Sequence, residues 1–96
     1  MTFKKTNTKP SVEPIVYVVD DDPAVRDGLT WLLDSMSYPC RAFASAREFL
    51  DAYEPVRPGC LIADVRMPQM SGLDLQMEMA ERYINLSMIM ISERLM

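Results

Sequence analysis

The 96-residue sequence contains no histidine. This absence excludes Ser-His-Asp and Cys-His nucleophilic machinery and any histidine-ligated zinc site. Any histidine that takes part in the chemistry must therefore come from a partner. No apolar run approaches the roughly 20 residues that span a bilayer, and the N-terminal lysines are not followed by the apolar segment of a secretory signal. We therefore expect no membrane association.

Cysteine is also scarce, and basic residues are few after the N-terminal segment. The two cysteines, Cys40 and Cys60, form no C-x-x-C pair, which predicts free thiols and a cytoplasmic location. Residues 1–14 are predicted to be a disordered lead-in, and residues 15–96 to be one domain. That domain carries thirteen acidic and seven basic side chains. This balance argues against direct binding of nucleic acid and favours small cations and basic partners.

Short apolar runs alternate with segments of helical periodicity. Strands are predicted over 15–19, 38–43, 60–64 and 87–92, with helices over 23–36, from 46 to a break at Pro55, and over 72–83. Three polar residues stand where helix N-caps belong: Asp22 before Pro23, Ser45 in an S-x-x-E capping box, and Ser71. The alternation predicts an α/β fold, a doubly wound parallel sheet with helices on both faces.

Acidic side chains follow two of the predicted strands. Asp20 and Asp21 come directly after the first strand, and Asp64 ends the third. If these strands are neighbours, about 4.8 Å apart, the three carboxylates meet at the carboxyl edge of the sheet, where open α/β sheets bind ligands. Such a cluster needs neutralisation. Mg²⁺ is the natural candidate, because it takes oxygen ligands and leaves positions open for phosphate oxygens.

Three motifs in this order resemble the receiver domain of two-component response regulators, especially the FixJ type. They are "VVDDD" at 18–22, "ADVRMPQMSG" at 63–72 and "IMIS" at 89–92. The resemblance implies a flavodoxin-like sheet of order 2-1-3-4 and a non-enzymatic function in phosphorelay signalling. In the loop after Asp64, Pro68 would fix its own φ, and Gly72 would permit unusual dihedral angles.

The resemblance also implies a role for each matching residue. Asp64 matches the phosphoacceptor, which takes a phosphoryl group from a sensor histidine kinase. Asp20 and Asp21 match the pair that holds Mg²⁺ together with Asp64, and Arg66 matches the position whose backbone carbonyl also binds the metal. Ser92 matches the hydroxyl residue that contacts the phosphoryl group and switches the domain.

The family pattern continues beyond the point where this sequence stops. Receiver domains have a fifth strand, two further helices, a lysine and an aromatic switch residue after the position of Ser92, and these have no counterpart here. We therefore expect a receiver truncated after its fourth strand and impaired in function. The exposed edge of that strand is an association hazard, which predicts either self-association through this edge or an unstable fragment.

Two other functions are compatible with part of the sequence. The runner-up is an interaction module that works without phosphorylation, or a non-functional receiver remnant. The other is an enzyme, because "VYVVDDDPA" loosely fits the haloacid-dehalogenase pattern, with Asp20 as nucleophile and Asp22 as general acid. However, Ala24 stands at the Thr/Val position of that pattern, and the motif around Asp64 would go unexplained.

Overall fold

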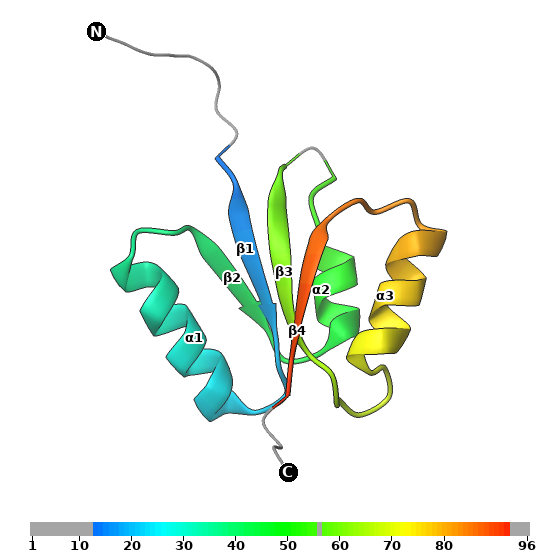
Figure 1. Ribbon diagram of the computed structural model, residues 1–96, viewed down its shortest axis with the longest axis horizontal. Helices are drawn as coiled ribbons and strands as arrows, with labels where there is room; N and C mark the ends of the chain where they lie inside the picture. The colour runs from blue at the N-terminus through cyan, green and yellow to red at the C-terminus, as the bar shows by residue number, and fades with distance from the viewer. Residues whose placement is uncertain (1–12, 56, 93–96) are drawn as a thin grey trace, which may run out of the picture.

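The computed structural model describes residues 13–55 and 57–92 and has an α/β architecture (Figure 1). Its strands are β1 (Ile15–Val19), β2 (Cys40–Phe43), β3 (Gly59–Asp64) and β4 (Ser87–Ile91). Its helices are α1 (Pro23–Ser35), α2 (Ala46–Ala52) and α3 (Gly72–Glu81). All strand pairings are parallel, and the order is β2-β1-β3-β4. The predicted fold class and strand order are confirmed.

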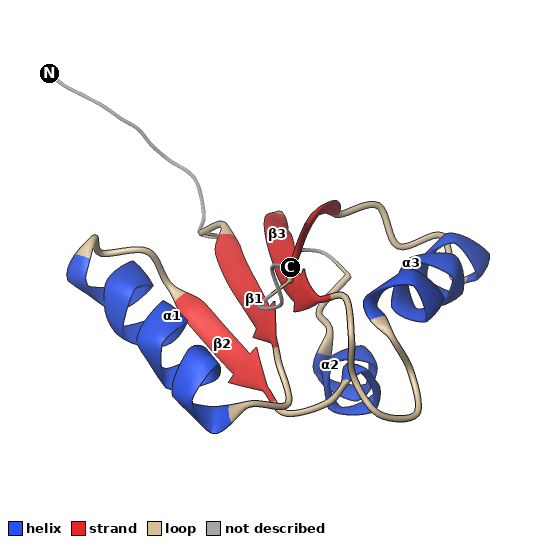
Figure 2. Ribbon diagram, turned by 60° about the horizontal axis from the view of Figure 1, so that its bottom comes forward, coloured by secondary structure: helices blue, strands red, loops and turns tan. Residues whose placement is uncertain are grey.

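The helices lie on both faces of the sheet, α1 on one and α2 and α3 on the other (Figures 1 and 2). Each begins at the predicted cap. Asp22 accepts a hydrogen bond from the N–H of Ala24, and Ser45 accepts one from the N–H of Glu48. Ser71 forms a reciprocal capping box with Asp74. These side chains satisfy N–H groups that have no partner inside the helix.

Most of the core lies between the sheet and the pair α2 and α3. The buried cluster on this side consists of Ile15, Tyr17, Val19, Ala46, Phe49, Leu50, Leu61, Ala63, Leu75 and Met79. Tyr17 lies at its centre, with the ring of Phe49 edge-on at 5.1 Å between centroids. On the opposite face α1 packs against β1 and β2. Leu33 is the only buried residue of α1. The two faces of the sheet are therefore covered unequally.

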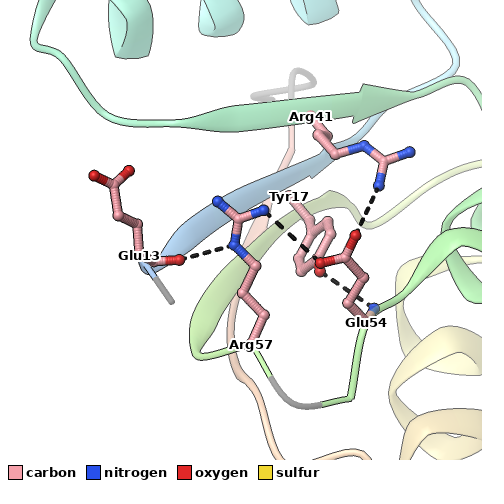
Figure 3. Close-up of polar contacts among 5 residues, drawn as sticks. All are labelled: Glu13, Tyr17, Arg41, Glu54 and Arg57. Carbon is pink, nitrogen blue, oxygen red and sulfur yellow. Dashed lines mark hydrogen bonds and ion pairs between the residues drawn. The ribbon is translucent and has the colours of Figure 1, made fainter. Parts of the chain in front are cut away.

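Polar contacts fasten the segment after α2 to the sheet (Figure 3). The N–H of Glu54 donates to the hydroxyl of Tyr17 at 3.4 Å, and the Glu54 carboxylate lies 3.8 Å from both Arg41 and Arg57. Nε of Arg57 donates to the backbone carbonyl of Glu13 at 2.8 Å. The ion pairs are long and partly exposed, so they contribute little to stability. The buried tyrosine hydroxyl, in contrast, gains a needed partner.

α1 and α3 end one and two residues earlier than predicted, at Ser35 and Glu81. After α3 the N–H of Ile84 bonds to the carbonyl of Met79 at 2.9 Å, across a residue in the left-handed region, Tyr83 (φ 58°). Ser37 (φ 65°) follows α1 in the same way. The apolar residues continue at helical spacing beyond the point where the left-handed residue ends the helix, so the sequence pattern predicts helix ends that are too late.

The strained conformation of Tyr83 makes a prediction about stability. Its side chain is 93% exposed, so replacing it removes little packing, whereas the left-handed conformation costs a side-chain-bearing residue about 1 kcal/mol. Tyr83→Gly is therefore expected to raise the free energy of unfolding by about 0.5–1 kcal/mol in urea denaturation. The control is Tyr38→Gly at an exposed tyrosine whose φ is not positive, and it should destabilise the chain. Equal effects of the two changes would contradict this account.

The predicted lead-in, residues 1–14, lies almost wholly outside the described residues, so its disorder stays a prediction. Glu13 and Pro14 are exposed and precede β1 without regular structure. Among residues 13–55 and 57–92, no helix is long and apolar enough to cross a bilayer.

Candidate metal and phosphoacceptor site

The topology brings the acidic residues of two strands together. β1 and β3 are parallel neighbours, with Val19 opposite Ala63 in the register. Asp20, the next residue after β1, and Asp64, the last of β3, therefore emerge at the same carboxyl edge. The sequence-based expectation that these strands are adjacent, and that their carboxylates meet, is confirmed.

Asp20, Asp21 and Asp64 form a compact cluster. One carboxylate oxygen from each residue lies within 4.8 Å of the others. Asp20 is fully buried and Asp64 is 5% exposed, whereas Asp21 is exposed to solvent. The three predicted acidic ligands thus lie together, two in the interior and one at the entrance.

Only part of the Asp20 side chain has a hydrogen-bond partner. Its Oδ1 accepts from the N–H of Asp22 at 2.9 Å. Its Oδ2 is buried and accepts no hydrogen bond from the part of the chain that the structure describes. A buried carboxylate oxygen without a partner is costly. Such an oxygen therefore calls for either a proton or a cation.

The electrostatic environment of Asp20 also favours a bound proton or cation. Burial raises the pKa of Asp20 above the ordinary value for aspartate, against the lowering effect of the hydrogen bond from the N–H of Asp22. The negative charges of Asp64, Asp21 and Asp22 raise this pKa further. A divalent cation would offset the effects of burial and of charge repulsion on this pKa, and would stabilise the ionised form of Asp20.

Arg26 is a component of the site that sequence reasoning missed. Its Nη1 donates to the backbone carbonyl of Asp20 at 2.7 Å. This bond joins the first turn of α1 to the end of β1 and brings a positive charge near the acidic cluster. The sequence did contain one indication of this contact. Arg26 stands four residues after the helix cap Asp22, and a side chain at that position points toward the helix N-terminus and can reach beyond it.

Backbone hydrogen bonds hold the chain around Asp64. The N–H of Arg66 donates to Oδ1 of Asp64 at 3.2 Å, and the N–H of Val65 donates to the carbonyl of Ile91 in β4 at 2.9 Å. The N–H of Gly72 donates to the carbonyl of Val65 at 2.9 Å, which closes the loop. The carboxylate of Asp64 is therefore positioned by its own loop, which is also bonded to the neighbouring strand β4.

The expectation that Gly72 permits unusual dihedral angles is wrong. No glycine in the described residues has a positive φ; the left-handed residue of this loop is Gln69 (φ 71°). Gly72 is needed because the backbone lies against it. A Cβ at this position would be 2.7 Å from the carbonyl oxygen of Asp64 and 3.1 Å from Cα of Val65. The requirement is for space rather than for an unusual dihedral angle.

The remaining predicted residues lie around the same edge. Asp22 caps α1, as expected from the Asp-Pro pair, with its Oδ1 2.9 Å from the N–H of Ala24. Ser92 is exposed and directly follows β4, whose Ile91 lies opposite Asp64 in the register. Arg66 reaches the site through its backbone N–H. The metal-binding role of its carbonyl and the phosphoryl contact of Ser92 stay predictions.

The donor set fits Mg²⁺. All three side chains offer carboxylate oxygens, the hard ligands that this ion prefers. Asp20 also has a buried Oδ2 that accepts no hydrogen bond within the described residues. The exposure of Asp21 leaves one side of the cluster accessible to water and to a phosphate group. Three carboxylates without nitrogen or sulfur ligands do not form a typical zinc site.

Comparison with known proteins agrees with this geometry. The sequence model of the response regulator receiver domain family matches residues 16–96. The chain belongs to this family. As a receiver domain it is 48% identical over 85 residues to the transcriptional regulatory protein TdiR of Thauera aromatica. That alignment covers 88% of this chain and 37% of TdiR, so the receiver domain spans little more than a third of that relative's length.

Solved structures confirm the receiver fold. The response regulator StyR superposes with a TM-score of 0.82 and 38% identity, over 88% of this chain and 44% of StyR. The crystal structure of FixJ-N gives a TM-score of 0.78 and 34% identity, over 85% of this chain and 66% of FixJ-N. The similarity to FixJ that the three sequence motifs indicated is thus confirmed in three dimensions.

Proposed function

We propose that this receiver domain is a phosphoacceptor in two-component signalling, working in the cytoplasm with a sensor histidine kinase as its partner. The observation that carries the proposal is the position of Asp64. Its carboxylate is nearly buried at the carboxyl edge of the sheet, within 4.8 Å of those of Asp20 and Asp21. Family membership supports the kinase as the source of the phosphoryl group.

The chemistry divides between the chain and its partner. The chain has no histidine, so the phosphohistidine belongs to the kinase. A carboxylate oxygen of Asp64 attacks phosphorus, the P–N bond of the phosphohistidine breaks, and the imidazole leaves. Phosphoryl transfer requires in-line positioning and neutralised oxygen charge rather than covalent help. The loop bonds to Asp64 provide the positioning.

Mg²⁺, when bound, would supply the neutralising charge. Asp20, Asp21 and Asp64 would hold it, and the backbone carbonyl of Arg66 is proposed as a further ligand. We assign the hydroxyl of Ser92 to the contact with the phosphoryl group, because β4 ends beside Asp64 and Ser92 is the next residue. The assignment of Ser92 rests on its place in the fold and on its match to the family motif.

A direct test uses a small phosphodonor in place of the kinase. The purified 96-residue chain is incubated with acetyl phosphate and Mg²⁺, and its intact mass is measured. We expect one phosphoryl adduct on the wild type and none on Asp64→Ala, because that change removes the nucleophile. Omitting Mg²⁺ should also suppress the adduct.

The matched control is Asp74→Ala, which removes an exposed acidic cap of α3 that lies outside the cluster. This variant should still be phosphorylated. A wild-type chain that folds and binds Mg²⁺ but acquires no adduct would overturn the phosphoacceptor proposal and favour an interaction module that works without phosphorylation. An adduct on Asp64→Ala would show that the reactive residue is a different one.

A further inference from the structure

The three carboxylates of the proposed metal site are held to different degrees. Oδ1 of Asp64 accepts a hydrogen bond from the N–H of Arg66. Oδ1 of Asp20 accepts one from the N–H of Asp22. Asp21, in contrast, is exposed and makes no hydrogen bond or ion pair, by main chain or side chain, within the described part of the chain. The position of this ligand therefore depends on how the chain on either side of it is fixed.

The connection that carries Asp21 is short and is fastened at both ends. The N–H of Asp20 still bonds to the carbonyl of Phe43 in β2 at 3.1 Å, and Asp22 already caps α1. Asp21 alone connects these two points, where β1 ends and α1 begins at the same edge of the sheet (Figure 1). Its position thus follows from the orientation of the two peptide groups that flank it.

Arg26 fixes the first of these peptide groups. Its Nη1 donates, at 2.7 Å, to the carbonyl of Asp20, which belongs to the peptide group between Asp20 and Asp21. The donor is charged and the contact is partly buried, so this hydrogen bond is a strong one. The second peptide group is held by the bond from the N–H of Asp22 to Asp20. Arg26 is therefore the one side chain outside the cluster and its helix cap that restrains this connection, within the described residues.

The guanidinium of Arg26 bonds to the main chain rather than to a carboxylate. It forms no ion pair within the described residues. The charges that shift the pKa of Asp20 are the negative charges of Asp64, Asp21 and Asp22. The arrangement therefore orients a ligand and does not neutralise the cluster.

We propose that Arg26 is a positioning residue for the metal site: its hydrogen bond to the carbonyl of Asp20 holds the carboxylate of Asp21 where it binds Mg²⁺. This inference rests on the proposed function of the acidic cluster as a Mg²⁺ site. Groups that orient metal ligands without touching the metal typically contribute a factor of about 10–100 to metal affinity. Removing the bond should therefore weaken Mg²⁺ binding.

The sign of the effect separates positioning from electrostatics. A positive charge near three carboxylates repels Mg²⁺, so loss of the Arg26 charge alone would strengthen binding. Loss of an orienting hydrogen bond weakens binding instead. Salt screens the electrostatic contribution but leaves the geometric one, so the weakening should persist at high ionic strength.

A Mg²⁺ titration of the isotope-labelled chain at pH 7, followed by amide chemical shifts, measures Kd and verifies that each variant is folded. Arg26→Met keeps an unbranched, helix-favouring side chain but removes the donor. It is expected to raise Kd at least about fivefold, in both about 50 mM and about 500 mM KCl. Arg26→Lys keeps a charged donor on a shorter side chain and should raise Kd at least about twofold, but less than Arg26→Met. If Arg26→Met does not fold, the comparison of Arg26→Lys with the wild type decides.

The matched control is Gly28→Glu, which makes the net charge more negative by the same amount. Gly28 is an exposed residue of α1, and a Cβ there would meet nothing within 4 Å. This variant should leave Kd unchanged or lower it. An unchanged or lower Kd in Arg26→Met, or an equal rise in Gly28→Glu, would overturn the role of Arg26.

The titration also separates this inference from the proposed function. A wild type that binds Mg²⁺ but acquires no phosphoryl group would overturn the phosphoacceptor function, and the positioning role of Arg26 would be supported by its own Kd values. A wild type that binds no Mg²⁺ would overturn both. An unchanged Kd in both Arg26 variants, with normal phosphorylation of the wild type, would overturn the positioning role alone.

Discussion

Added Mg²⁺ is expected to raise the free energy of unfolding of the wild-type chain at pH 7 and to have almost no effect on Asp20→Asn. The buried Oδ2 of Asp20 has no hydrogen-bond partner in the described residues, and three carboxylates gather within 4.8 Å. A ligand that binds only the folded state at about ten times its Kd adds about 1.4 kcal/mol. Urea denaturation with and without Mg²⁺ measures this increment.

The neighbouring aspartate provides a matched control. Asp22→Asn makes the same chemical change two positions away, but Asp22 caps α1, and asparagine caps a helix as well as aspartate does. This variant should therefore keep the full response to Mg²⁺. Loss of the response in Asp22→Asn, or its persistence in Asp20→Asn, would contradict the assigned metal site.

The raised pKa of Asp20 determines how this response varies with pH. Because its pKa is higher in the folded state than in the unfolded chain, the folded state holds the proton more tightly. Without Mg²⁺, the stability that this group contributes is present below the unfolded pKa and is lost as pH rises through the folded pKa. Protons compete with the cation for Asp20, so the stabilisation by Mg²⁺ should decrease as pH falls from the folded pKa of Asp20 toward its unfolded pKa. Subtracting the pH profile of Asp20→Asn isolates this group.

Gly72→Ala is expected to lower the free energy of unfolding by about 1–3 kcal/mol and to slow phosphorylation of Asp64. The added Cβ would meet backbone atoms of Asp64 and Val65, which cannot rotate away as a side chain could. Relief requires movement of the main chain that carries Asp64. Chemical denaturation measures the first effect, and the rate of adduct formation with acetyl phosphate measures the second.

The same substitution at Gly28 should have the opposite effect on stability. Gly28 is an exposed residue in the interior of α1, and a Cβ there would meet nothing within 4 Å. Alanine favours the helix over glycine, so Gly28→Ala should stabilise the chain by about 0.5–1 kcal/mol and leave phosphorylation unchanged. If both changes stabilised the chain, close packing could not be the reason for Gly72.

Local signals in the sequence were sufficient for most of the fold. The β-branched run at Ile15–Val19, the Asp22-Pro23 pair and the capping residues Ser45 and Ser71 each act within a few residues, and each predicted element is present. The ends of the helices were less predictable. A tyrosine at position 83 gives no sign that the backbone turns left-handed there, because such turns ordinarily carry glycine or asparagine.

The acidic cluster was predictable from sequence because strand ends in a parallel sheet share one edge, and the resemblance to receiver domains implied that the strands before Asp20 and Asp64 are neighbours. The supporting contacts were not predictable. The bond from Arg26 to the carbonyl of Asp20 depends on one side-chain conformation. The contact at Gly72 depends on how closely the loop returns to β3. Both are properties of the packed chain rather than of any local pattern.

The parallel order of the strands also governs when the site can exist during synthesis. Ile15 of β1 lies opposite Gly59 of β3, 44 positions later. At ribosomal rates of about 5–20 residues per second, β1 is made roughly 2–9 s before its second neighbour. Until then β2 is the only strand beside β1 in the described sheet, and Asp64 is not yet next to Asp20. Asp20, Asp21 and Asp22 are adjacent and repel one another from the start, but the repulsion from Asp64 arises only once β3 has paired with β1. That part of the repulsion therefore opposes the joining of β1 and β3 rather than the formation of β1 beside β2.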